Sequence, residues 1–186
     1  MDDILTAICE RARERFPERV GAPVEAFGET SIDVARDELL DVVRYLRDEE
    51  GYDFLADWSA VDHLGQTEPD RRFLCAAHLA SIREQRPRLR LRVWIPDGDE
   101  TCPSLTGIWP TADFQEREMF DFFGIRFEGH PDLRRIFMPE EWEGHPQRKD
   151  YPLGGTNVQY EHGVFIPPPD RRGQGATTTG YPGGLS

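Results

Sequence analysis

The sequence predicts an α+β fold, in which a small mixed or antiparallel sheet packed with helices is followed by an irregular motif region and an extended C-terminal tail. Apolar residues recur at helical spacing near the N-terminus and again after residue 38. Between residues 89 and 95, apolar residues alternate with arginine or tryptophan, which is the period of a strand with one buried face. From residue 154 onward glycine and proline are frequent, and such a segment cannot build a core of its own.

The N-terminal part predicts a helix followed by two short strands. Apolar residues over 4–16 follow helical spacing, and Pro17 ends that helix because proline lacks the N–H that the ladder needs. Short strands are expected over 24–27 and 31–34, with a turn at residues 28–29.

A second helix and three longer strands follow. The helix is indicated by an apolar stripe made of Leu39, Val42, Val43 and Leu46. Strands are expected over 54–61, 73–82 and 89–95. The strand over 73–82 is apolar on both faces, as a central strand would be.

A third helix is expected over 113–123, ending at Gly124, since glycine is the usual residue just past a helix C-terminus. Its apolar face is predicted to consist of Phe114, Phe120 and Phe123. We divide the chain into an α+β body over 1–110, a helix and loop motif region over 111–153 that completes the same domain, and the tail over 154–186.

The charge distribution excludes some partners. The 186 residues carry 22 Lys and Arg against 35 Asp and Glu, a net charge of −13, and residues 1–70 alone hold 7 basic and 19 acidic side chains. Such a chain repels phosphate, so we expect no nucleic-acid partner and no direct binding to an anionic lipid surface. The acidic N-terminus and the absence of long apolar runs predict a cytoplasmic protein. The cysteines form no C-x-x-C pair; they are Cys9, Cys75 and Cys102.

A row of arginines lies on one face of the strand over 89–95 and extends just before it. Its members are Arg86, Arg88, Arg90 and Arg92. The row could dock an acidic partner or a phosphate, but pairing with carboxylates of this acidic chain is the favoured interpretation.

No catalytic motif is evident. A metal-dependent hydrolase could be built from Glu118, Asp121 and His130, since Glu118 and Asp121 share a helix face. The favoured alternative is that charged residues near this helix form ion pairs that anchor it to the following loop; they are Glu116, Arg117, Glu118, Asp121 and Arg126. Glycine-rich phosphate loops and the G-x-S-x-G turn are absent.

The motif region contains a short internal repeat. Gly129-His130-Pro131 and Gly144-His145-Pro146 each combine a flexible residue, a hydrogen-bonding ring and a fixed φ, and each is followed by a basic pair. Large apolar residues lie between the two copies. The repeat is compatible with a loop packed on its own domain, but it favours a preformed surface for another protein.

Residues 116–135 (EREMFDFFGIRFEGHPDLRR) also resemble the signature of a known family, and the similarity continues over 138–146 and 148–153. The family is the C subunit, or thirty-kilodalton subunit, of proton-translocating NADH–quinone oxidoreductase, respiratory complex I. The residues that carry the motif are Glu116, Arg117, Glu118, Asp121, Gly124, Gly129, His130, Pro131 and Arg135.

The resemblance implies a non-catalytic scaffold subunit in the hydrophilic arm of the complex, on the cytoplasmic face of a bacterial membrane. Members are expected to hold no cofactor themselves, because FMN and the iron–sulfur clusters lie on partner subunits. The implied partners are chiefly the D subunit and neighbours near the B subunit, and membrane association is expected only through the assembled complex. An alternative is the equivalent subunit of a complex I relative, such as a membrane-bound hydrogenase or a dehydrogenase linked to ferredoxin or F420.

On this interpretation we expect part of the motif region to face the partners. The candidate contact residues are His130, Arg134, Arg135, His145, Arg148, Lys149 and Tyr151. Replacing both Arg148 and Lys149 by alanine is predicted to deplete the assembled complex while leaving the isolated subunit folded.

Overall fold

The computed structural model describes residues 3–152, 159–160 and 163–164. The chain divides into two units, Met1–Tyr151 and Pro152–Ser186. Almost all of the predicted tail lies outside the described residues; its described part is an antiparallel pair of β8 (Gln159–Tyr160) and β9 (Gly163–Val164). Among the residues described, no helix is both long enough and apolar enough to span a bilayer.

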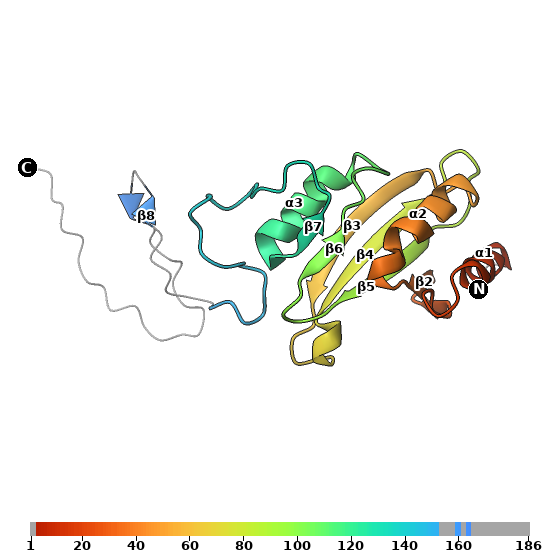
Figure 1. The fold of residues 1–186 in the computed structure, drawn as a ribbon, viewed down its shortest axis with the longest axis horizontal. Helices are drawn as coiled ribbons and strands as arrows, with labels where there is room; N and C mark the ends of the chain where they lie inside the picture. Colours follow the sequence, from red (N-terminus) through yellow and green to blue (C-terminus); the bar gives the residue numbers. More distant parts are fainter. Residues whose placement is uncertain (1–2, 153–158, 161–162, 165–186) are drawn as a thin grey trace, which may run out of the picture. The chain divides into compact units, whose positions relative to one another are not determined.

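The first unit is built on a five-stranded sheet, shown in Figure 1. In spatial order its strands are β1 (Val24–Ala26), β2 (Glu29–Asp33), β5 (Leu89–Ile95), β4 (Phe73–Ala80) and β3 (Phe54–Asp62). β2 and β5 are parallel, whereas the other neighbours are antiparallel. The predicted mixed sheet is therefore confirmed. β4, which was expected to be a central strand, lies between β5 and β3.

The β1–β2 turn lies one residue earlier than predicted. Ala26 pairs with Glu29, so the loop is Phe27-Gly28 and Glu29 already belongs to a strand. The two loop residues have φ values of 54° and 78°. Positive φ at both central positions is the pattern of a type I′ turn, which follows the twist of the strands that it joins.

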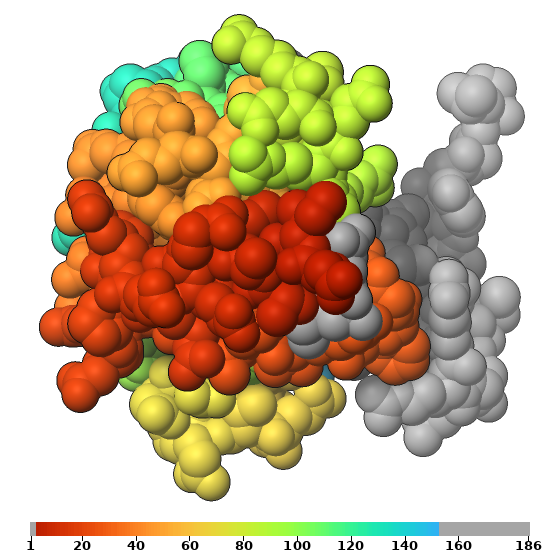
Figure 2. All heavy atoms as spheres, turned by 90° about the vertical axis from the view of Figure 1, so that its right-hand side faces the viewer, coloured from red at the N-terminus to blue at the C-terminus, as the bar shows by residue number. Residues whose placement is uncertain are grey.

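Two helices cover one face of the sheet. They are α1 (Asp3–Arg15) and α2 (Leu39–Asp48), the second preceded by the 3₁₀ turn η1 (Arg36–Glu38). Figure 1 shows α2 lying along the sheet with α1 beyond it, and Figure 2 shows α1 in red at that end of the molecule. The predicted stripe of α2 is fully buried, against the inward side chains of β4 and β5. Burial of each such side chain contributes about 1.5–3 kcal/mol.

Glu50 joins these helices to the loop before β5. Its carboxylate is buried and accepts hydrogen bonds from Arg11 of α1 (2.6 and 2.7 Å), from the hydroxyl of Tyr45 (2.6 Å) and from Arg86 (2.9 Å). Burial alone would raise the pKa of Glu50, but these donors hold it below its ordinary value. The helical layer is thus fixed to the sheet by charge as well as by packing.

Arginines on the outer face of β5 pair within the chain. Arg90 pairs with Glu29, and Arg92 lies 2.6 Å from Asp33, both on the parallel neighbour β2. Arg88 is exposed. Internal pairing, the favoured interpretation of the arginine row, is confirmed for these two residues and for Arg86.

The motif region begins with α3 (Ala112–Phe123), which lies at the other end of the sheet with the short parallel pair β6 (Thr101–Pro103) and β7 (Arg126–Glu128) (Figure 1). A second 3₁₀ turn, η2 (Pro69–Arg71), precedes β4.

The predicted apolar face of α3 is partly wrong. Phe114 is 66% exposed, whereas the side chains that are buried are those of Ala112, Glu116, Met119, Asp121 and Phe123. The helix therefore packs with two carboxylates inside, because each of them finds donors on neighbouring segments.

Candidate functional site

The loop over 129–151 is folded onto the C-terminal end of α3. The last carbonyl oxygens of a helix have no partner within it, and here this loop supplies the donors. His145 Nδ1 donates to the carbonyl of Asp121 at 3.0 Å, the backbone N–H of Gln147 donates to Phe122 at 3.1 Å, and Arg148 Nε donates to Phe123 at 2.5 Å. The negative end of the helix dipole also favours the cation of Arg148.

Asp121 is the central anchor of this loop. Its Oδ2 atom accepts three consecutive backbone N–H groups, those of Ile136 (3.1 Å), Phe137 (2.7 Å) and Met138 (2.9 Å). Its Oδ1 atom accepts from Arg135 at 2.8 Å. Burial would raise the pKa of Asp121, but the donors, with the N–H of Met138 foremost, hold it below its ordinary value.

Arg135 extends the anchor to the second half of the loop. Besides Asp121, its guanidinium donates to the carbonyls of Trp142 (3.0 Å) and Gly144 (2.8 Å). One planar cation therefore links the helix to two turns of an otherwise irregular segment, a geometry that suits arginine better than lysine.

The two motif histidines hold opposite ends of α3. His130 Nε2 donates to the carbonyl of Asp113 in the first turn (3.1 Å) and its Nδ1 accepts from the N–H of Asp132 (3.0 Å), whereas His145 binds the last turn. Eight residues of helix, about 12 Å, separate Asp113 from Asp121. Burial foremost lowers the pKa of His145, so this ring is neutral at pH 7.

The structure does not assemble the hydrolase site considered above. Glu118 is exposed, Asp121 is buried and engaged with four donors, and His130 lies at the other end of the helix. No group of three or more His, Cys, Asp or Glu that could hold a metal ion exists in the described part of the chain.

Glu116 is the second buried carboxylate of α3. Its two oxygens accept from the backbone N–H of Leu105 and the hydroxyl of Ser104, both at 2.6 Å. Neither donor is a cation, and burial raises the pKa of Glu116 to about 7. The prediction that Glu116 forms an ion pair is therefore wrong. This residue fixes the segment after β6 by accepting hydrogen bonds from neutral donors.

The distal end of the loop is tied to the sheet by Arg72, whose side chain is almost fully buried. It lies 2.6 Å from Asp97, 2.8 Å from Asp150 and 3.4 Å from Asp62. Asp62 also accepts the N–H of Lys149 at 2.8 Å. No sequence motif marked this cluster, because its members are far apart in the chain and carry no common spacing.

The candidate contact residues divide into anchored and outward-facing side chains. Arg135, His145 and Arg148 are engaged as described, Tyr151 donates to the carbonyl of Glu143 at 3.3 Å, and the His130 ring is buried. Arg134 and Lys149 are exposed.

Two phenylalanines add to the outer surface of this region. Phe137, 56% exposed, stacks on Phe122 with ring centroids 5.0 Å apart, and the guanidinium of Arg117 lies over exposed Phe114. Of the remaining motif residues, Gly129 has a φ of 85° and Pro131 is exposed. We call Arg134, Phe137 and Lys149 the motif surface.

Replacing Gly124 by alanine should lower the free energy of unfolding by about 1–3 kcal/mol. Gly124 has a φ of 75°, and an added Cβ would lie 2.5 Å from the His145 ring and 2.8 Å from Arg148. Urea unfolding of the purified chain measures the loss. Gly98→Ala is the control, because Gly98 has a φ of 83° but nothing within 4 Å; equal losses for both variants would contradict the clash with the loop.

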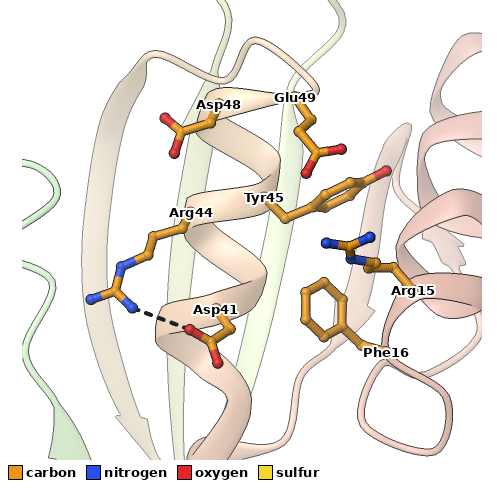
Figure 3. Close-up of a pocket in the computed structure, with 7 residues that line it drawn as sticks. All are labelled: Arg15, Phe16, Asp41, Arg44, Tyr45, Asp48 and Glu49. Atoms are coloured by element: carbon orange, nitrogen blue, oxygen red, sulfur yellow. Dashed lines mark hydrogen bonds and ion pairs between the residues drawn. The ribbon is translucent and has the colours of Figure 1, made fainter.

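A cavity of about 340 Å³ lies outside the motif region, between α1 and α2 (Figure 3). It is lined by Arg15, Phe16, Asp41, Arg44, Tyr45, Asp48 and Glu49. Its wall includes the Arg44–Asp41 ion pair, and Asp48 pairs with Arg47. Its composition matches no catalytic arrangement, so the motif region remains the candidate functional site.

Comparison with known proteins gives one family. The family described as "Respiratory-chain NADH dehydrogenase, 30 Kd subunit" matches residues 32–157. Proteins named as the C subunit of NADH-quinone oxidoreductase are similar over most of the chain. That of Mycolicibacterium gilvum is 44% identical, covering 92% of this chain and 75% of its own, and that of Acidothermus cellulolyticus is 44% identical, covering 88% and 84%.

Solved structures agree on the fold. A trypsin-resistant fragment of Nqo5 (residues 1–134) superposes with a TM-score of 0.58 at 32% identity, over 70% of this chain and 99% of the fragment. A chain of an archaeal membrane-bound sulfane sulfur reductase superposes with a TM-score of 0.65 at 22% identity, over 79% of this chain and 85% of that chain. The second likeness concerns the fold alone.

Proposed function

This chain belongs to the family of the 30-kDa subunit of respiratory-chain NADH dehydrogenase, and from that membership we propose that it acts in the complex as a scaffold without chemistry of its own. It is a subunit of NADH–quinone oxidoreductase, in the hydrophilic arm of complex I. The complex passes electrons from NADH to quinone and couples this to proton translocation. The alternative of a complex I relative is not favoured, since the relatives quoted above carry the NADH–quinone name.

The proposal includes where the cofactors lie. FMN and the iron–sulfur clusters are held by partner subunits, and this chain holds none. Two features support this division: the three cysteines are free and buried, and the motif residues Asp121 and Arg135 bind each other and backbone groups of the loop. The contribution of the chain is to fix the position of neighbours that carry the electrons.

The proposed partners are chiefly the D subunit of the complex and neighbours near the B subunit. The chain works among them as a peripheral part of a membrane-associated complex, on the cytoplasmic face of a bacterial membrane. Proteins with this name and fold come from multi-subunit complexes, which supports partners of that kind.

The observation that carries the scaffold role is the anchoring of the motif region. Buried groups on α3, and Arg72 just before β4, hold the loop over 129–151 at both ends, while the motif surface remains outward. A preformed surface loses little conformational freedom on association, which strengthens binding. The buried residues of the motif region thus fix the shape of the surface, and its exposed residues contact the partner subunit.

The double variant Arg134→Ala, Lys149→Ala tests this role. We expect it to lower the amount of assembled complex on native gels several-fold while the circular dichroism spectrum and melting midpoint of the purified chain stay unchanged, because both side chains are exposed. This variant is a better test than the Arg148 and Lys149 variant suggested by the sequence. Arg148 also donates to the carbonyl of Phe123 and lies 3.4 Å from Glu100, so its loss would disturb the fold.

Arg13→Ala, Arg83→Ala is the matched control, with two exposed arginines outside the motif region. Full assembly combined with reduced NADH–quinone turnover in the motif variant would contradict a scaffold role and indicate a direct part in electron transfer.

A further inference from the structure

Lys149, near the end of the motif region, keeps an unpaired charge. It is the only lysine of the chain, and it is exposed. Both of its neighbours in sequence are paired, since Arg148 lies 3.4 Å from Glu100 and Asp150 lies 2.8 Å from Arg72. In the part of the chain that the structure describes, the ammonium of Lys149 forms neither an ion pair nor a hydrogen bond.

The main chain at this position is nevertheless fixed. The backbone N–H of Lys149 donates to Oδ2 of Asp62 at 2.8 Å, and Asp62 is buried beside Arg72. One residue earlier, the guanidinium of Arg148 donates to the carbonyl of Phe123. A side chain on a fixed main chain loses less freedom on binding than one on a mobile loop, so Lys149 is preorganised for a contact outside the chain.

The carboxylates around this stretch of main chain are engaged by an arginine. Asp62, Asp97 and Asp150 lie 2.6–3.4 Å from the guanidinium of Arg72. Three carboxylates around one guanidinium leave a surplus of negative charge, which favours a cation at position 149. The cluster therefore suits the ammonium of Lys149 but does not pair with it.

We propose that the ammonium of Lys149 pairs with a carboxylate of a neighbouring subunit in the respiratory complex. This inference rests on the proposed function, because it takes the chain to be one subunit among others. An ammonium only donates, and its strongest hydrogen bonds are those to an anionic acceptor. Arg134, the other cation of the motif surface, already pairs with Asp132, so Lys149 is the cation that is left for a partner.

A protein carboxylate fits better than a membrane surface or a second copy of the chain. An anionic bilayer would bring an extended layer of like charge against a chain with a net charge of −13. A second copy would bring two such acidic bodies together. A neighbouring subunit can present a single carboxylate at the contact without either repulsion.

Carbodiimide crosslinking of the purified complex tests this pair directly. The reagent activates a carboxylate, which then forms an amide bond with an amine in contact with it, while the carbodiimide leaves as a urea. Because the chain has one lysine, a product between its lysine and an Asp or Glu of another subunit identifies both ends of the contact by mass spectrometry. Absence of such a product, or a product with a second copy of the chain or with lipid, would overturn the inference.

The double variant Lys149→Arg, Arg88→Lys is the matched control, because it moves the only lysine and keeps the net charge. Arg88 is exposed and forms no ion pair among the residues described. The variant should assemble as the wild type does and give no product with another subunit. An equal yield of such a product from position 88 would mean that the reagent reports exposure, which would remove the support for a contact at Lys149.

The charge itself is tested by competition between Lys149→Gln and Lys149→Arg. In cells that express both chains, we expect Lys149→Gln to enter the complex at least about tenfold less well, because the carboxylate of the partner is left unpaired. Mass spectrometry of the purified complex gives the ratio. Both purified variants should keep the melting midpoint of the wild type, since the N–H bond to Asp62 remains.

Equal incorporation of the two variants would overturn the inference, and so would a lower melting midpoint that accounts for the loss of Lys149→Gln. Failure of the wild-type chain to enter the complex at all would instead overturn the proposed function.

Discussion

The Asp121→Asn variant is expected to lose about 3–5 kcal/mol of unfolding free energy at pH 7. The buried carboxylate accepts Arg135 and the three N–H groups of Ile136, Phe137 and Met138. An amide offers one acceptor and turns its NH₂ group toward donors, so buried donors lose their partner and the cation of Arg135 is left uncompensated.

Urea unfolding of the purified chain, followed by circular dichroism and tryptophan fluorescence, measures this loss. Asp132→Asn is the control, because Asp132 belongs to the same loop but pairs with Arg134 in solvent, where such a pair contributes at most about 1 kcal/mol. A loss below 1 kcal/mol for Asp121→Asn would show that the loop does not depend on this carboxylate.

Acid should remove the same stabilisation from the wild type. The folded-state pKa of Asp121 is depressed, so its contribution is present above the unfolded-state value of 3.8 and is lost as the pH falls through the folded-state value. The difference between wild type and Asp121→Asn should therefore be constant from pH 5 to 8 and shrink only in stronger acid.

The Glu116→Gln variant is expected to be more stable than the wild type at pH 8.5, by about 3 kcal/mol at most. Burial raises the pKa of Glu116 from 4.5 to about 7, so the folded chain binds this proton more tightly than the unfolded chain. The contribution of Glu116 is complete below pH 4.5 and is lost as the pH rises through about 7. Glutamine keeps one acceptor for the Leu105 N–H, and its NH₂ can donate to the Ser104 hydroxyl.

The measurement is the unfolding free energy of both chains from pH 5.5 to 8.5. His145 titrates in the opposite sense, since its pKa is depressed and its contribution is lost as the pH falls, but it is present in both chains and cancels in their difference. Glu118→Gln, at an exposed position of the same helix, should give a difference that does not change with pH. A flat difference for Glu116→Gln as well would mean that Glu116 stays charged in the fold.

Regular elements of this chain could be predicted because their apolar periodicity dominates the local sequence. The stripe of α2, the alternation in β5 and the end of α3 at Gly124 are all local signals. The apolar face of α3 was misassigned because the pattern rule places carboxylates in solvent. Ala112, Glu116, Met119 and Phe123 do follow helical spacing, and admitting a buried glutamate there would have identified the correct face.

The loop over 129–151 could not be predicted from periodicity, because side-chain contacts to backbone groups determine its path rather than a repeating pattern. Asp121 and Arg135 stood out in the sequence as motif residues, but their partners did not: Trp142 and Gly144 contribute carbonyl oxygens, which every residue has. Arg72 and Asp62 were missed for the same reason, as a cluster assembled from separate segments of the chain leaves no trace in local composition.

We expect the contacts of the Arg72 cluster to form late in folding. Asp62 is 87 residues from Lys149 in the chain, and Arg72 is 78 residues from Asp150. Contacts of such long sequence separation close late, after β3 and β4 have paired. On this expectation the loop reaches its final shape only on a finished sheet, so that a partner recognising the motif surface would distinguish a mature chain from a nascent one.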